Sequence, residues 1–156
     1  MEINLNQFKQ NYLVSGLSDE DIAKVAELAQ LKGVEGGQEI VKLGKTDSDL
    51  YIILDGTAMV YKQGGVLLGE RGPGSVIGEI ALIDNLPRSA YVVSRNYLTY
   101  AVIDGKGLRR FMVQNKDIGF IMLSNLSRVL SVRLREASQA IEDLQGKLAD
   151  PWIYTE

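Results

Sequence analysis

Apolar and polar positions follow three patterns along the chain, and the first of these predicts a helix. Ser18 precedes three acidic residues, and apolar residues then recur with helical spacing over positions 22–29. Serine is a favoured helix N-cap, and acidic residues in the first turn complement the helix dipole. Residues 1–32 are therefore expected to form an N-terminal helical part that contains one capped amphipathic helix.

The pattern between residues 33 and 107 consists of short apolar runs separated by glycine-containing turns. Eleven of the 16 glycines lie between Gly33 and Gly78, and Gly64-Gly65 between two runs is typical of a hairpin turn. Many short strands with glycine turns predict an antiparallel β-barrel of the jelly-roll type. The expected strands cover residues 39–43, 50–54, 57–62, 66–70, 90–94 and 98–103.

Residues 108–149 return to helical spacing, with a short helix expected at 108–114 and a longer one at about 117–148. Apolar residues in the longer helix recur in alternating steps of four and three, which is the heptad pattern of a coiled coil. We expect this seam to form a homodimer, although Ser127 and Ala137 weaken it. The alternative is that the first half of the helix only packs on the barrel. The expected dimer contacts are Leu130, Leu134, Ile141 and Leu144.

These patterns together predict a single α+β domain over residues 1–156, a barrel flanked by an N-terminal helix and a long C-terminal helix. Asp150-Pro151 is expected to end the long helix, because proline lacks the backbone N–H that a helix needs. Residues 150–156 then form a tail that contains Trp152 and Tyr154. These aromatic residues could dock on the surface or on a partner.

Composition excludes several classes of function. The chain has 156 residues, of which 46% are hydrophobic and 24% are charged, and its net charge is −3. With no cysteine, it has no disulfide or thiolate metal site, and a cytoplasmic location is expected. With no histidine, it lacks the commonest general base and metal ligand, so neither an enzyme nor a metal cofactor is expected. No apolar run is long enough to span a membrane, and the charge does not favour nucleic-acid binding.

The densest group of candidate functional residues lies within residues 72–91. Gly78 allows a tight turn or a close approach of the backbone to a ligand. Residues 79–82 can form a helical turn whose N-terminal amides face an anion. Arg88 supplies a planar guanidinium that matches phosphate oxygens, and Ser89 and Ala90 follow it with a hydroxyl and free amides. These residues predict a compact oxyanion pocket.

This segment resembles the phosphate-binding cassette of the cyclic-nucleotide-binding domain family, as found in catabolite activator proteins and protein kinase A regulatory subunits. The family pattern is Gly-Glu-(Leu or Ile)-Ala-Leu, a short loop, and Pro-Arg-(Ser, Thr or Ala)-Ala. It is matched position by position by Gly78-Glu79-Ile80-Ala81-Leu82 and by Pro87-Arg88-Ser89-Ala90. Residues 37–40 and 50–56 are also similar to early strands of the family, and the resemblance covers roughly residues 17–148.

The resemblance implies specific contacts with a cyclic nucleotide, which would be the ligand in place of a cofactor. Glu79 would accept a hydrogen bond from the ribose 2′-hydroxyl, and Arg88 would pair with the cyclic phosphate. The backbone amides of Ala81 and Ala90 and the Ser89 hydroxyl would complete the phosphate site. A receptor is implied rather than a hydrolase.

Further contacts are implied around the sugar and the base. Val76 and Ile77 could flank either group. In dimeric transcription factors of the family the long helix reaches the base, and Ser138 lies where that contact would occur. Tyr91 stands where the family often has threonine or serine, so its ring could lie near the ligand or point outward. The Ser89 hydroxyl does not distinguish cAMP from cGMP, and cAMP is the first expectation.

The leading interpretation is a stand-alone receptor that signals to an unidentified protein effector through its long helix. In some relatives an aromatic residue near this end of the chain covers the base. Only seven residues follow the expected helix, too few for the helix-turn-helix module of related transcription factors, so DNA binding is not expected. The alternatives are a dimeric scaffold without nucleotide, a fragment of a longer regulator, and a cupin-type barrel enzyme, which would normally need histidine ligands.

Overall fold

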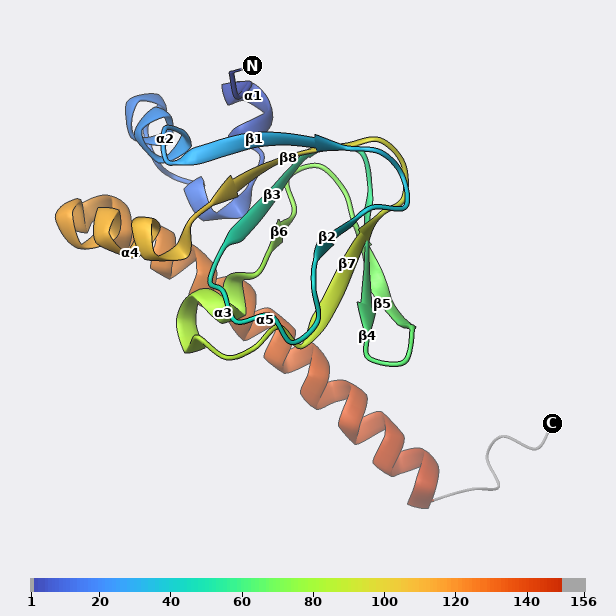
Figure 1. Cartoon of the computed structure of the whole chain (residues 1–156). Coiled ribbons are helices and arrows are strands. Elements are labelled where there is room, and N and C mark those ends of the chain that lie inside the picture. The colour runs from blue at the N-terminus through green and yellow to red at the C-terminus, as the bar shows by residue number, and fades with distance from the viewer. Residues whose placement is uncertain (1, 150–156) are drawn as a thin grey trace.

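The computed structural model describes residues 2–149, which form two antiparallel sheets with helices before and after them (Figure 1). The strand order is β1-β8-β3-β6 in one sheet and β2-β7-β4-β5 in the other. The strands are β1 (Ala29–Val34), β2 (Glu39–Val41), β3 (Leu50–Asp55), β4 (Ala58–Lys62), β5 (Val66–Arg71), β6 (Val76–Ile77), β7 (Ala90–Ser94) and β8 (Leu98–Ile103).

The two sheets pack as a double-sheet jelly roll, and the strand pairing described for residues 2–149 does not close them into one barrel. Side chains alternate across a strand, and β3 shows the consequence. Tyr51 and Ile53 belong to the core shared by both sheets. Leu50 and Ile52 belong to a second core that the first sheet shares with the helices. This sheet is therefore covered on both faces, which explains the unbroken apolar run of β3.

The N-terminal helical part ends earlier than the sequence predicts. Helix α2 (Asp19–Ala26) has the expected cap, since the Ser18 hydroxyl accepts a hydrogen bond from the Asp21 amide at 3.2 Å. From Ala29 onward the chain pairs with β8, with Ala29 opposite Ile103. The prediction of helical structure to residue 32 is wrong there, because pairing with β8 supplies the backbone hydrogen bonds. Helix α1 (Leu5–Phe8) and the 3₁₀ turn η1 (Tyr12–Val14) precede α2.

Both C-terminal helices are present, and each starts slightly earlier than predicted. Helix α4 (Gly105–Gln114) is capped by Asp104, and α5 (Lys116–Ala149) is 34 residues long. The first part of α5 packs on the core, and the buried Asn125 amide donates to the carbonyls of Leu13 and Ser15 at 3.0 and 2.8 Å. The predicted stop at Asp150-Pro151 lies outside the described residues.

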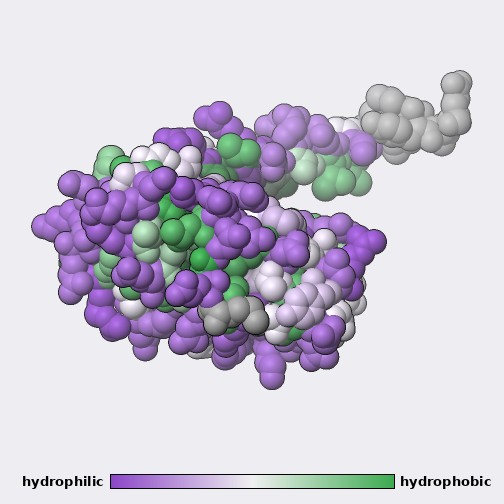
Figure 2. Space-filling view, turned by 90° about the horizontal axis from the view of Figure 1, so that it is seen from above, coloured by the Kyte–Doolittle hydropathy of each residue, from purple (hydrophilic) through white to green (hydrophobic). Residues whose placement is uncertain are grey.

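The second half of α5 extends beyond the sheets (Figure 1). Figure 2 shows hydrophobic side chains exposed along this projecting segment. Between residues 2 and 149, no helix is both long and apolar enough to cross a membrane. Most of the predicted seam is exposed. The exposed apolar stripe on this face of α5 begins at Phe120, before the first predicted dimer contact at Leu130. Its large apolar members are Phe120, Leu123, Leu134, Ile141, Leu144 and Leu148.

Candidate functional site

Residues 76–90 form a strand, a tight turn, a short helix and a loop in succession. Gly78 lies between β6 and α3 (Glu79–Asp84) with a φ of 95°. A Cβ atom there would lie 2.5 Å from the Asp49 carbonyl oxygen and 2.5 Å from the Arg88 guanidinium, so glycine is required at this position. Arg109 of α4 donates to the Leu82 carbonyl and to Asn85 Oδ1 at the other end of α3. The segment is therefore held at both ends.

A cavity of about 290 Å³ lies between this segment, the second sheet and α5. Its volume is near the lower end of small-molecule sites, which start at about 300 Å³. Ser138 does not line it, since this residue is exposed farther along α5. The structure brings the other nine predicted residues together on its wall. They are Val76, Ile77, Gly78, Glu79, Ile80, Ala81, Arg88, Ser89 and Ala90.

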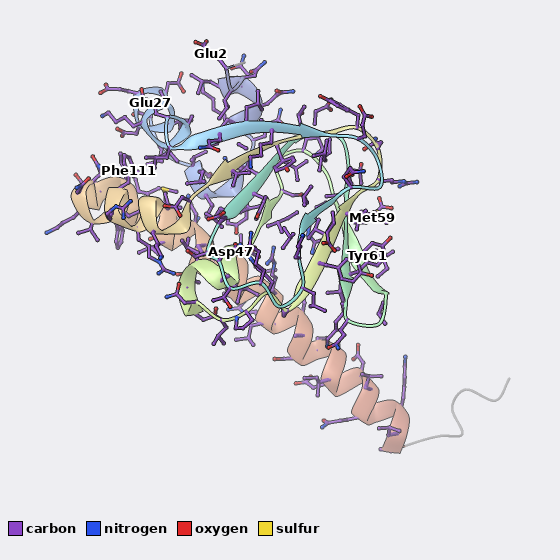
Figure 3. All side chains as sticks on the ribbon, viewed as in Figure 1. Glu2, Glu27, Asp47, Met59, Tyr61 and Phe111 are labelled. Carbon is purple, nitrogen blue, oxygen red and sulfur yellow. The ribbon has the colours of Figure 1, made fainter. Side chains whose placement is uncertain are left out.

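Arg88 is 6% exposed and is held by the loop between β2 and β3. Its guanidinium forms an ion pair with Asp47 and donates to the Asp49 and Gly78 carbonyl oxygens at 2.6 and 3.3 Å. Figure 3 shows Asp47 in this loop, close to α3. The buried Arg88 Nε has no hydrogen-bond partner among the described residues. A buried donor without an acceptor is costly, so this site can accommodate an anionic oxygen.

Asp47 and Tyr51 both lie beside the Arg88 guanidinium, and the pKa values of both are shifted from their ordinary values. Burial alone would raise the pKa of Asp47, but the hydrogen bond and the charge of Arg88 outweigh it and lower that pKa below its ordinary value. Burial, with a smaller contribution from Asp47, raises the pKa of Tyr51 to about 12, and the Arg88 guanidinium lies 5.8 Å from the centre of that ring. At neutral pH the site therefore holds an ionised Asp47 and a neutral Tyr51.

Glu79 lies at the start of α3 and is 5% exposed. Arg133 of α5 donates a hydrogen bond to its carboxylate and forms an ion pair with it. Arg133 also lines the cavity, which α5 therefore closes on one side. The sequence does not predict the roles of Arg133 and Asp47, because each lies more than 40 residues from its partner. No local motif marks either residue.

The other residues of interest lie away from the cavity. Tyr91 stacks on Tyr61 of β4, which is labelled in Figure 3, with ring centres 5.2 Å apart and an interplanar angle of 16°. Neither tyrosine lines the cavity. Tyr91 therefore points outward, the second of the two expected orientations. Trp152 and Tyr154 lie outside the described residues. Within residues 2–149, no group of three or more acidic side chains is placed to hold a metal ion.

A family model described as cyclic nucleotide-binding domain matches residues 31–115. The cAMP-dependent protein kinase regulatory subunit of Eremothecium gossypii is 32% identical over 100 residues, which cover 64% of this chain and 22% of that protein. The corresponding subunit of Yarrowia lipolytica is 27% identical over 164 residues, which cover 94% of this chain and 43% of that protein. The chain thus spans less than half the length of these relatives.

A similar solved structure is the catabolite activator protein of Thermus thermophilus. The TM-score is 0.77 at 24% sequence identity, and the match covers 86% of this chain and 63% of that one. At this level of identity the likeness shows the fold: antiparallel sheets with a long C-terminal helix.

Proposed function

This chain belongs to the cyclic nucleotide-binding domain family, and we propose that the cavity beside α3 is its nucleotide site. The family is a binding and regulatory family rather than a catalytic one. The observation that carries the proposal is the buried Arg88 guanidinium, whose Nε lacks an acceptor at the wall of a cavity. A cyclic phosphate supplies a negative charge and acceptor oxygens, which such a group requires.

The proposed contacts divide between phosphate and ribose. Arg88 pairs with the phosphate, which also accepts hydrogen bonds from the Ser89 hydroxyl and from the amides of Ala81 and Ala90. Glu79 accepts a hydrogen bond from the ribose 2′-hydroxyl. Support comes from the placement of all five residues on one cavity wall and from the burial of both charged side chains.

We propose that the ligand acts on α5 through Glu79. Arg133 forms an ion pair with this carboxylate, so a ribose hydroxyl must share it or displace the guanidinium. Either change alters a contact between α5 and the cavity. A ligand shifts a conformational equilibrium only through such differential contacts. A protein effector that recognises α5 could then distinguish the two states.

We propose cAMP as the preferred ligand, with cGMP as the alternative. The names of the two relatives, which are subunits of cAMP-dependent kinases, support cAMP. The wall that the second sheet contributes is largely apolar, with Val41, Val60 and Leu68, and suits the flat face of a purine. Ser138 lies about 7.5 Å beyond Arg133 along α5, so its proposed contact with the base requires movement of α5 or a second copy.

A homodimer through the α5 seam completes the proposal. Leu134, Ile141 and Leu144 are exposed, and Leu130 is half-buried in the same register. Exposed apolar stripes of this length usually mark an interface.

Calorimetric titration of cAMP and cGMP into the wild type and Arg88→Ala tests the site. We expect the substitution to weaken binding about tenfold to a hundredfold, since a charged hydrogen-bond partner contributes about 1.5–3 kcal/mol. Arg110→Ala, which removes an exposed arginine of α4, is the matched control and should bind like the wild type. If folded wild-type protein bound neither nucleotide, the alternative of a nucleotide-free scaffold would replace the proposal.

A further inference from the structure

Two adjoining hollows lie between η1 and α5, next to the nucleotide cavity. Their volumes are about 430 and 360 Å³, and both are lined by Tyr12, Val129 and Arg133. One extends along α5 to Arg128, and the other extends along the turn after β5 to Arg71. We call them together the Tyr12 groove. Arg133 and Arg71 also line the nucleotide cavity, so the two sites share a wall.

The charged side chains that line the Tyr12 groove are all positive. Three arginines line it, and no acidic residue does. Within residues 2–149, neither Arg71 nor Arg128 forms an ion pair; Arg71 donates to the Glu70 carbonyl at 2.9 Å and Arg128 to Asn125 Oδ1 at 3.3 Å. Arg133 uses one nitrogen for Glu79, and a guanidinium has five N–H donors. Arg133 therefore has further N–H groups that can donate to another acceptor.

Tyr12 adds a donor without a partner. Its hydroxyl oxygen is buried and makes no hydrogen bond within the described part of the chain. Burial raises the pKa of Tyr12 more than the charge of Arg133 lowers it, so the hydroxyl keeps its proton at neutral pH. Buried polar groups are nearly always hydrogen-bonded, so a hydroxyl without a partner favours an acceptor beside it.

We propose that the Tyr12 groove is a second anion site that binds a phosphate group, distinct from the cyclic nucleotide site. The Tyr12 hydroxyl and the Arg133 guanidinium would hold the phosphate, with Arg71 and Arg128 on either side. A group with several acceptor oxygens fits a hollow that offers charged donors, and arginine matches phosphate geometry. The phosphate could be free or carried by a small ester.

The proposed dimer leaves one side of the groove open. In the heptad register that places Leu134 and Ile141 at a positions, Arg128, Val129 and Val132 fall at b, c and f, away from the seam, while Arg133 falls at g and flanks it. A second copy on the seam would therefore leave the Arg128 side of the groove uncovered.

The test is an NMR titration of the full chain with inorganic phosphate and with AMP, at constant ionic strength and with chloride as reference. It is carried out in the Arg88→Ala background, which removes the proposed phosphate contact of the nucleotide site. We expect saturable shifts at Tyr12 and Arg128. Tyr12→Phe and Arg128→Gln should each weaken binding at least about fivefold, while Arg110→Gln should not.

The two probes separate the sources of the phosphate. Saturation by inorganic phosphate supports a site for free phosphate, and saturation by AMP alone supports a site for phosphate esters. Linear shifts without saturation, or equal affinities in Tyr12→Phe and its parent, would overturn the proposal. Cyclic nucleotide binding by wild-type protein is measured separately, so failure here would leave the proposed function standing.

Discussion

At the level of single residues, each buried charge of the nucleotide cavity has a partner that lies far away in the sequence. Arg88 pairs with Asp47, 41 residues earlier, and Glu79 pairs with Arg133, 54 residues later. Both charges are therefore compensated within the protein itself. Under the proposed function, binding of a cyclic nucleotide would exchange partners at these residues, and the affinity would reflect the difference between the two sets of contacts.

Asp47→Asn removes the negative charge that compensates Arg88. We expect the ligand-free variant to melt at a lower temperature, because Arg88 is left buried without a counter-ion. We also expect cAMP to raise its melting temperature more than it raises that of the wild type, because the phosphate then restores the missing charge. Asp55→Asn, at an exposed end of β3, is the control. If cAMP raised the melting temperature of the wild type and of Asp47→Asn by the same amount, the proposed exchange of partners at Arg88 would be wrong.

The same pair predicts a pH dependence. Arg88 keeps the folded-state pKa of Asp47 below the ordinary value of 3.8, so its contribution to stability is present above that value. As the pH falls through the lowered pKa, Asp47 becomes protonated and the contribution is lost. The stability difference between wild type and Asp47→Asn, measured by urea unfolding, should therefore shrink in acid. A difference that persists at the lowest accessible pH would speak against this assignment.

Gly78→Ala tests whether the backbone of the cassette tolerates a side chain. The new Cβ would meet a backbone carbonyl at 2.5 Å in addition to the strain of a positive φ. Gly16→Ala has a similar φ of 86° but open space around it, so it isolates the strain. We expect Gly16→Ala to cost about 1 kcal/mol in urea unfolding, and Gly78→Ala to cost more and to weaken nucleotide binding as well. Equal costs would mean that the close contact is unimportant.

At the level of elements, the sequence predicts well what depends on neighbouring residues. The cassette is recognisable because its glycine, acid and arginine fall within a dozen positions, and the Ser18 cap marks the start of α2. Strand β1 carries only a short strand signal, the apolar–polar alternation of Ala29-Gln30-Leu31-Lys32, and it directly follows the apolar positions of a predicted helix. Its strand structure depends on pairing with β8, which the local sequence does not encode.

Site residues that are close together in the sequence are likewise predictable, and those brought in from distant elements are not. Nine of the ten predicted residues come from one segment and meet at one cavity. Arg133 and Asp47 arrive from other elements through the tertiary fold. Ser138 was placed by analogy with relatives rather than by a local pattern, and it lies off the cavity wall.

Asn125→Ala tests how α5 is attached to the N-terminal region. The substitution leaves the Leu13 and Ser15 carbonyls without their donor at a largely buried contact. We expect a loss of about 1–3 kcal/mol in unfolding free energy, measured with urea. Gln139→Ala removes an exposed amide of the same helix and should change stability by less than about 0.5 kcal/mol. Similar losses of unfolding free energy in both variants would show that the Asn125 hydrogen bonds do not stabilise the attachment of α5.

At the level of the whole molecule, Ile141→Glu tests the proposed dimer. Ile141 is 57% exposed at an a position of the seam, so a new carboxylate there would be buried between two copies. We expect dimer affinity in sedimentation to fall at least about tenfold. Gln139→Glu adds the same charge at an f position and should dimerise like the wild type. A wild-type protein that stays monomeric at high concentration would rule out the seam as an interface.

The length of α5 has a mechanical consequence. Arg133 contacts the cassette, and the helix continues for 16 residues to Ala149, or about 24 Å at 1.5 Å per residue. Under the proposed coupling of the ligand to α5, this projecting segment would act as a lever that pivots at Arg133. A tilt of about 10° at Arg133 would move the far end by about 4 Å over that length. The helix would thus convert a small rearrangement at Arg133 into a larger displacement of its far end. Inserting or deleting whole turns beyond Arg133 would change the size of that displacement without changing nucleotide occupancy.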